Sequence, residues 1–264
     1  MPEVVVLSTR DGDRTRSKTG GPSKDQFPAH ARPAIRSGRG ASQKARETLL
    51  TQTIVEELVV KSRHRVKTYG EVFTPRRMVD RMLDLVHEEL EAGPGFVDKT
   101  FLEPAAGDGN FLVAILHRKL AAIKKRYPPA DWPYESLFAL ASIYGIELLG
   151  DNHADAKAAM LNEFLSFHTP HQVPCGPRTR LRRAAAFLID TNVLQGDTLT
   201  GLKPDGEEIE FSWWNRVSDR PGIVQRIPFR LASLREDNLL DLRTYDTYAV
   251  CRIDHVHEQA RTRG

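Results

Sequence analysis

The sequence predicts an α/β fold with a doubly wound, mostly parallel sheet. Three short apolar strands, expected at residues 100–102, 142–146 and 192–195, alternate with helical segments. Such an alternation requires crossover connections, which place helices on the faces of a parallel sheet. An acidic residue stands at the end of each strand, and ligands of open α/β sheets bind outside the carboxyl ends of the strands. These predicted binding residues are Glu103, Glu147 and Asp197.

The composition excludes several classes of protein. The 264 residues are 40% hydrophobic and 28% charged, with two cysteines, so there is material for a core but not for a disulfide framework. No apolar run approaches the ~18 residues that a membrane span needs. The apolar start Val4–Leu7 is too short for a secretory signal. A cytoplasmic protein with no membrane partner is expected.

The charge distribution predicts a basic, disordered tail over residues 1–45. The first 67 residues carry 14 Lys/Arg against 7 Asp/Glu, whereas the remainder carries 24 against 28. Segments rich in Gly, Ser, Pro and Arg cannot bury enough surface to offset their chain entropy. The tail is either a solvated extension or a nucleic-acid contact made through phosphate charge. The rest, 46–264, divides into N-terminal helices over 46–92, a ligand-binding core over 98–200 and an extension over 201–264.

Local signals predict where the helices begin and end. Thr74 is a suitable N-cap, with Pro75 at the first helical position, for a helix that continues to Leu90. Cations favour a helix C-terminus, so the basic run 61–67 is expected to end a helix that begins near Ala45. Two more helices are expected, one from 111 to 120 and one from 154 to 164, the second capped by Asp151 or Asn152. A loop is expected over 168–183, followed by an apolar segment of ambiguous type over 184–189. A further strand is expected over 245–250.

The loop after the first strand indicates the kind of ligand. Gly107 and Gly109 allow a close approach to the backbone, but the order of residues is not Gly-x-Gly-x-x-Gly. Glu103 and Asp108 would repel a pyrophosphate and suit a cationic or zwitterionic group. Glu147 can accept from ribose hydroxyls and Asp197 from an exocyclic amine. The ligand expected is a nucleoside with a positively charged, amino-acid-like tail, which S-adenosylmethionine fits.

Four segments in this order resemble the N6-adenine DNA methyltransferases of the gamma motif order, as in type I modification subunits and phage-type methylases. The match extends from about Gly70 to Leu199, about half of the chain. The segments are Glu71–Pro75, Phe101–Leu112, Tyr144–Glu147 and Asn192–Asp197.

The resemblance implies the fold of the S-adenosylmethionine-dependent methyltransferases and that compound as cofactor. It implies DNA as substrate in a restriction-modification or phage system, with a second methyltransferase or specificity subunit as a partner. The cofactor-binding residues that it implies are Phe73, Thr74, Pro75, Glu103, Pro104, Ala105, Gly107, Asp108, Gly109, Asn110, Phe111, Glu147, Leu148, Asp197 and Thr198.

The chain departs from this family in its catalytic motif. The family has Asp, Asn or Ser followed by two prolines and an aromatic residue after the fourth strand, and the aromatic stacks on the flipped base. Here the one Pro-Pro pair is Pro128-Pro129, which precedes the second strand. Trp214 and Asn215, with Trp213 and several arginines nearby, are the candidates for base stacking and amine binding. The alternative is that the two tryptophans pack a hairpin against the core.

Three functions therefore remain open. The first is an S-adenosylmethionine-dependent DNA adenine methyltransferase, which needs a partner chain if acceptor residues are missing. The second is a non-catalytic S-adenosylmethionine-binding subunit or a degenerate methyltransferase. The third is a methyltransferase for another acceptor. No metal is expected, because the spacings of the residues that could bind zinc match no standard finger. These residues are His168, His171, Cys175, Cys251, His255 and His257.

Overall fold

The computed structural model describes residues 4–6, 61–217, 220–234, 247–259 and 261–262. The chain forms two compact units, and each is described by itself. One unit combines Met1–Ser8 with Phe73–Gly264, and the other is Thr9–Val72.

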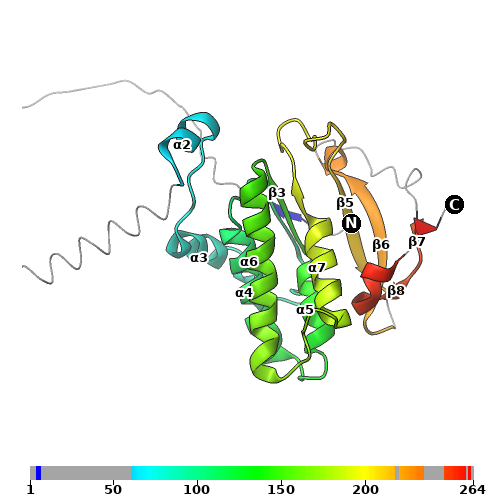
Figure 1. The fold of residues 1–264 in the computed structure, drawn as a ribbon. Helices are drawn as coiled ribbons and strands as arrows, with labels where there is room; N and C mark the ends of the chain where they lie inside the picture. Colours follow the sequence, from blue (N-terminus) through cyan, green and yellow to red (C-terminus); the bar gives the residue numbers. More distant parts are fainter. Residues whose placement is uncertain (1–3, 7–60, 218–219, 235–246, 260, 263–264) are drawn as a thin grey trace, which may run out of the picture. The chain divides into compact units, whose positions relative to one another are not determined.

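The larger unit is a mixed α/β structure built on a parallel sheet, as predicted (Figure 1). Its strands lie in the order β1-β2-β3-β4, all parallel to their neighbours. Their bounds are β1 Val4–Val6, β2 Thr100–Glu103, β3 Ile143–Glu147 and β4 Val193–Gln195. In register, Glu103 lies beside Gly145, and Glu147 beside Gln195. The acidic ends of β2 and β3 therefore meet at one edge of the sheet.

The strand β1 corrects the prediction that residues 1–45 form a tail throughout. Val4, Val5 and Val6 pair with Thr100, Phe101 and Leu102 on the side of β2 away from β3. The rest of the predicted tail and the helix expected from Ala45 lie in residues 7–60, outside the described residues.

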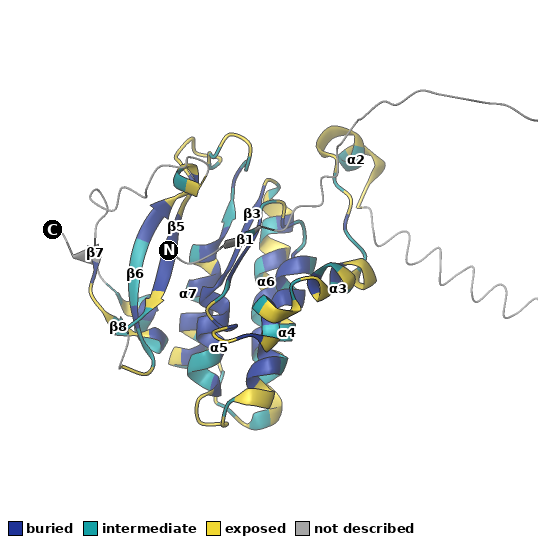
Figure 2. Ribbon diagram, turned by 180° about the vertical axis from the view of Figure 1, so that it is seen from behind, coloured by how far each residue is buried: buried dark blue, intermediate teal, exposed yellow. Residues whose placement is uncertain are grey.

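Four helices connect β2 to β4. They are α4 Asn110–Arg126, α5 Trp132–Ala141, α6 Gly150–His168 and α7 Arg180–Asn192. The two faces of β3 meet different layers. A Cβ placed on Gly145 would lie 2.8 Å from the Leu112 side chain of α4. Tyr144, on the opposite face, contacts a second sheet. The core of this unit therefore lies on both sides of β3, where Figure 2 shows buried residues.

The second sheet is antiparallel, in the order β5-β6-β8, with β5 Glu210–Arg216, β6 Ile223–Arg230 and β8 Cys251–Arg252. Tyr144 makes edge contacts with Phe211, Trp213 and Phe229 of this sheet. Its hydroxyl donates to the Ser212 carbonyl at 2.8 Å. Trp213 and Trp214 are buried, so the interpretation that the tryptophans pack a hairpin against the core is confirmed.

Short elements complete the described parts of this unit. Among the described residues, turns of 3-10 helix are η2 Thr169–His171, between α6 and α7, and η3 Leu231–Leu234 and η5 Ile253–Glu258 in the C-terminal extension. The expected strand at 245–250 is represented by β7 Thr247–Tyr248, which pairs with β9 Arg261–Thr262. It belongs to a separate antiparallel pair, so it is not a further strand of the parallel sheet.

Several predicted helix boundaries were wrong. Pro75, not Thr74, is the N-cap of α3 Arg76–Asp84, and the helix expected to reach Leu90 is interrupted before a π-helical turn, η1 Glu88–Ala92. Leu149 is the N-cap of α6, which places Asp151 and Asn152 inside that helix.

The predicted loop over 168–183 was also partly wrong. Its last residues, Arg180–Arg183, belong to α7, where the Thr179 side chain caps the helix by accepting from the Arg182 amide. The ambiguous segment 184–189 is helical.

In the smaller unit, α2 spans Arg63–Tyr69. The Ser62 side chain accepts from the Arg65 amide, and Gly70 ends the helix with φ +67°. Arg65 forms an ion pair with Glu71 at 2.5 Å. The basic run 61–67 therefore extends from the N-cap of α2 to Lys67 in its last turn. It does not end a helix that continues from Ala45, because Ser62 begins a new one, and this corrects the prediction. Across the described parts of both units, no helix combines the length and hydropathy that crossing a membrane requires.

Candidate functional site

The ends of β2, β3 and β4 are joined by hydrogen bonds into one site. The Ala106 amide donates to the Ile146 carbonyl at 2.9 Å, and the Gly196 amide donates to the Glu147 carbonyl at 3.0 Å. The Thr198 hydroxyl donates to the Pro104 carbonyl, which links the segment after β4 to the loop after β2. We call this region the strand-end site, meaning Glu103–Gly109, Glu147 and Asp197–Thr198.

Glu147 organises the strand-end site. Its Oε2 accepts from the Gly107 amide at 2.7 Å, and its Oε1 accepts from the Leu149 amide at 2.9 Å. Asn152 Nδ2 adds a longer bond to Oε1 at 3.4 Å. The carboxylate is 7% exposed, so these donors replace most of its water. A carboxylate oxygen has two acceptor positions, so Oε2 can accept one more hydrogen bond from a ligand.

Glu103 is the most unusual group of the site. It is 2% exposed, and its Oε1 accepts from the Ala105 amide at 3.0 Å. Its Oε2 is buried and has no hydrogen-bond partner in the described structure. Burial raises the pKa of Glu103 to about 8, although the Ala105 amide opposes this shift. A cation placed against Oε2 would supply the missing partner and favour the ionised form.

The loop between Glu103 and α4 depends on two glycines. Gly107 has φ +57° and Gly109 has φ +94°, in the left-handed region that favours glycine. A Cβ on Gly109 would lie 2.9 Å from Ala156 Cα of α6. A Cβ on Gly107 would lie 3.3 Å from the ring of Phe73. Both glycines therefore let the loop pack closely against its neighbours, in addition to leaving its backbone open to a ligand.

Asp197 lies at the third strand end and is half-buried. Its Oδ1 accepts from the Leu199 amide at 2.8 Å, which shapes the turn after β4. Its Oδ2 makes no hydrogen bond to the described residues, so this oxygen can accept from a ligand donor. Leu148 and Leu199 beside the site are 49% and 72% exposed.

The predicted cofactor residues outside the strand-end site include one group just before α3 and another at the start of α4. Phe73 is buried against Gly107, and Thr74 and Pro75 lead directly from it into α3. Asn110 begins α4, where Phe111 is 5% exposed and belongs to the hydrophobic core. Phe111 is therefore placed to support the loop rather than to contact a ligand.

Sequence reasoning missed the role of Asn152. The sequence predicts only a helix cap at this position, whereas the residue is 1% exposed and its amide faces Glu147. Its position five residues after Glu147, in the first turn of a helix that follows a strand, was the available signal.

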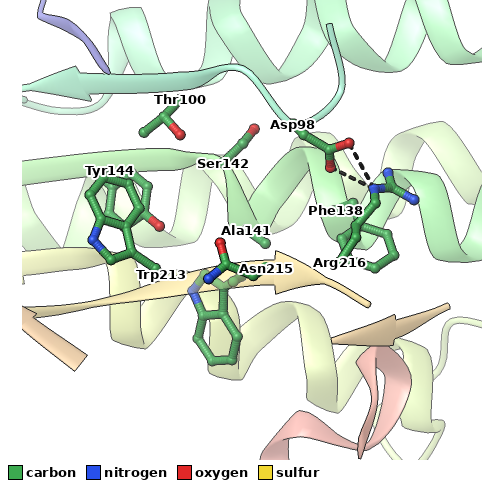
Figure 3. A pocket seen from close by; sticks show the side chains of 10 residues that line it. Asp98, Thr100, Phe138, Ala141, Ser142, Tyr144, Trp213, Asn215 and Arg216 are labelled. Carbon is green, nitrogen blue, oxygen red and sulfur yellow. Dashed lines mark hydrogen bonds and ion pairs between the residues drawn. The ribbon is translucent and has the colours of Figure 1, made fainter. Parts of the chain in front are cut away.

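The structure does not bring Trp214 and Asn215 to the strand-end site. They line a cavity together with Thr100, the first residue of β2, and Ser142, which directly precedes β3 (Figure 3). Glu103 and Glu147 are the last residues of the same strands. At about 3.3 Å per residue, the two ends of β2 are about 10 Å apart. Trp214 Nε1 donates to Asn192 Oδ1 at 2.9 Å, a packing role.

The strand-end site can bind an extended ligand that carries a cation and several hydrogen-bond donors. Buried Glu103 suits the cation, and the free acceptor positions on Glu147 and Asp197 suit hydroxyl or amine groups. Within the described residues, no group of three or more His, Cys, Asp or Glu side chains is arranged to hold a metal ion.

Comparisons with known proteins returned no match, whether with protein-family models, curated proteins or solved structures.

Proposed function

We propose that this chain binds S-adenosylmethionine at the strand-end site and is a DNA adenine methyltransferase, or the cofactor-binding chain of one. The single observation that carries the proposal is the Glu103 carboxyl, which is buried at the end of β2 with an unpartnered oxygen. A buried polar group without a partner costs free energy, so such a group indicates a ligand that satisfies it.

The residues present fit the groups of this cofactor. Glu103 would hold its positive charge, Glu147 a ribose hydroxyl and Asp197 the adenine amine. When bound, the cofactor supplies a methyl group carried on a sulfonium. The chain itself orients the ligand through the loop amides and keeps water from Glu103, because the carboxyl is 2% exposed.

The parallel pairing of the strands is compatible with the proposal that the sheet is of the doubly wound methyltransferase type. The described strands follow one another across the sheet in sequence order, β1-β2-β3-β4, so the support comes from their parallel pairing and not from a reversal of strand order. Ligands of open α/β sheets bind outside the carboxyl ends of the strands. Glu103 and its glycine loop stand at that position.

DNA adenine as acceptor rests on the resemblance of the four sequence segments. The motif of Asp, Asn or Ser with two prolines and an aromatic residue is absent from the sequence. We therefore propose that a second chain supplies the acceptor-binding residues and the recognition of the DNA target.

A non-catalytic S-adenosylmethionine-binding subunit is the second candidate. It is favoured by the position of Trp214 and Asn215, which line a cavity at the other end of the sheet. A methyltransferase for another acceptor is a third candidate, and the same experiments separate it from the first.

Calorimetric titration of the full chain with S-adenosylmethionine tests the binding proposal. The proposal is supported if binding is saturable and is weakened by each of the variants Glu103→Gln, Glu147→Ala and Asp197→Ala. It is refuted if no binding occurs or if the affinity is unchanged in all three variants.

Transfer of labelled methyl groups then tests the reaction. Plasmid DNA is incubated with the chain alone and with the product of the neighbouring reading frame. Label on adenine identifies a DNA methyltransferase, whereas binding without transfer in either case identifies a non-catalytic subunit.

A further inference from the structure

We propose that the cavity between the two sheets is a second binding site, which takes an uncharged nucleobase or nucleoside. It is separate from the strand-end site, and the inference does not depend on the proposed function. The cavity has a volume of about 180 Å³, which is room for a small ligand rather than for a single ordered water.

The walls of the cavity come from four elements, drawn from three separate parts of the sequence. β2 and β3 contribute Thr100 and Tyr144, the end of α5 contributes Phe138 and Ala141, and β5 contributes Trp213 and Asn215. Figure 3 shows Thr100 and Ser142 on one side of the space, facing Trp213 and Asn215 on the other. The site is thus built where the parallel and antiparallel sheets meet.

The charges at the cavity disfavour an anionic ligand. Arg216 Nε donates to both oxygens of Asp98, at 2.7 and 2.8 Å. Its two terminal nitrogens donate to the Glu135 carboxylate at 2.9 and 2.7 Å. One guanidinium is therefore shared by two carboxylates, and no positive charge is left for a phosphate. A neutral ligand avoids both this repulsion and the cost of burying an unpaired charge.

A polar group with unused hydrogen-bonding capacity lines the same space. The Asn215 side chain is exposed and makes no hydrogen bond to the described residues. Its carboxamide presents a donor and an acceptor side by side, the pattern that matches the edge of a nucleobase.

Aromatic rings favour a planar ligand over an aliphatic one. Phe138, Tyr144 and Trp213 contribute rings to the wall. The Arg216 guanidinium already lies over the Phe138 ring, 3.6 Å from its centroid, so Tyr144 and Trp213 are the rings left for stacking or edge contacts with a flat heteroaromatic molecule. Trp213 is already fixed by stacking on Phe229, with ring centroids 4.1 Å apart and planes at 11°. A prearranged wall of this kind lowers the ordering cost of binding.

The test is a fluorescence titration of the full chain with adenine, cytosine and adenosine, with toluene as an apolar ring that lacks polar edges. Two of the three tryptophans line the cavity, so binding is expected to change the emission. Asn215→Ala is expected to weaken base binding at least tenfold, and Thr100→Val to weaken it less. Gln225→Ala, which lies opposite Asn215 on β6 but does not line the cavity, is expected to leave binding unchanged.

Several results would overturn the proposal. They are no binding of any base, toluene binding as tightly as adenine, or equal affinity in the wild type and Asn215→Ala. Loss of base binding in Asp197→Ala would show that the bases occupy the strand-end site instead. If a single-stranded oligonucleotide bound in a way that requires Asn215 while free bases did not bind, the ligand of the cavity would be a nucleic-acid strand and not a small molecule. Circular dichroism of each variant verifies that the fold is retained.

Discussion

The Glu147 carboxylate accepts a hydrogen bond from the Gly107 amide at 2.7 Å, which joins the end of β3 to the loop that follows β2. The two residues are 40 positions apart in the sequence. The loop is thus held by the same acidic side chain that is expected to receive a ribose hydroxyl, so ligand affinity and loop stability are linked.

Glu147→Ala is expected to lower the free energy of unfolding by about 1–3 kcal/mol, because it leaves the partly buried Gly107 and Leu149 amides without an acceptor. Urea unfolding followed by circular dichroism measures the change. Glu88→Ala, at an exposed position of η1, is the control and should shift the midpoint little. Equal effects of the two substitutions would contradict the role assigned to Glu147.

Gly109→Ala is expected to destabilise the protein by about 1–3 kcal/mol, since φ is +94° and the new Cβ would lie 2.9 Å from Ala156 Cα. Gly95→Ala is a matched control, because Gly95 also has positive φ, +66°, but has nothing within 4 Å of the added Cβ. Denaturant unfolding of both variants separates backbone strain from the contact with α6. A larger loss for Gly95→Ala would show that the loop can move away from α6.

The raised pKa of Glu103, about 8, predicts that stability falls as pH rises. The folded state keeps a proton that the unfolded state releases near pH 4.5. The free energy of unfolding therefore falls between about pH 4.5 and 8, and the loss is complete above pH 8. Glu103→Gln removes this titration. The free energy of unfolding of the variant should therefore rise relative to that of the wild type, by a few kcal/mol, between pH 5 and pH 8.5. A difference that is constant over this range would mean that Glu103 is ionised in the folded protein.

The same carboxyl predicts proton release when a cationic ligand binds. A positive charge at Oε2 lowers the pKa of Glu103, so binding near pH 7 should expel a proton from the wild type but not from Glu103→Gln. Calorimetry in two buffers of different ionisation enthalpy measures the number of protons. Titration of the ligand's own amine occurs in both proteins and cancels in the comparison; identical proton release would place the cation away from Glu103.

Lys119→Met is expected to destabilise the protein by about 2–5 kcal/mol. Its fully buried Nζ donates to the Val97 and Lys99 carbonyls at 3.0 and 2.7 Å and to Ser142 Oγ at 2.6 Å. All three acceptors would lose their partner. Lys124→Met, on the exposed side of the same helix, is the control. Comparable midpoints for the two variants in urea would show that water replaces the lost bonds.

Much of the parallel sheet could be predicted from the sequence because its strands are short apolar runs that end at acidic residues. β2, β3 and β4 lie within a residue or two of their predicted positions, and the loop with Gly107 and Gly109 follows β2. The three acidic ends lie at one edge because the strands are parallel and in register.

Other elements could not be predicted, for identifiable physical reasons. α5 contains the continuous apolar run 137–141, which is buried throughout and so shows no amphipathic period. β1 has three residues, and its partner β2 begins at Thr100, so no local pattern marks it as part of a sheet. The burial of Glu103 and the bonds of Glu147 to the Gly107 and Leu149 amides depend on packing between segments, which spacing alone does not reveal.

The location of β1 matters for anyone who prepares this protein. Trimming the first eight residues as a dispensable leader would remove the strand that pairs with Thr100–Leu102 and leave that side of β2 bare. Bare strand edges invite pairing with other molecules. An affinity tag is therefore better fused after Gly264, and a shortened N-terminus is expected to precipitate more readily than the intact polypeptide.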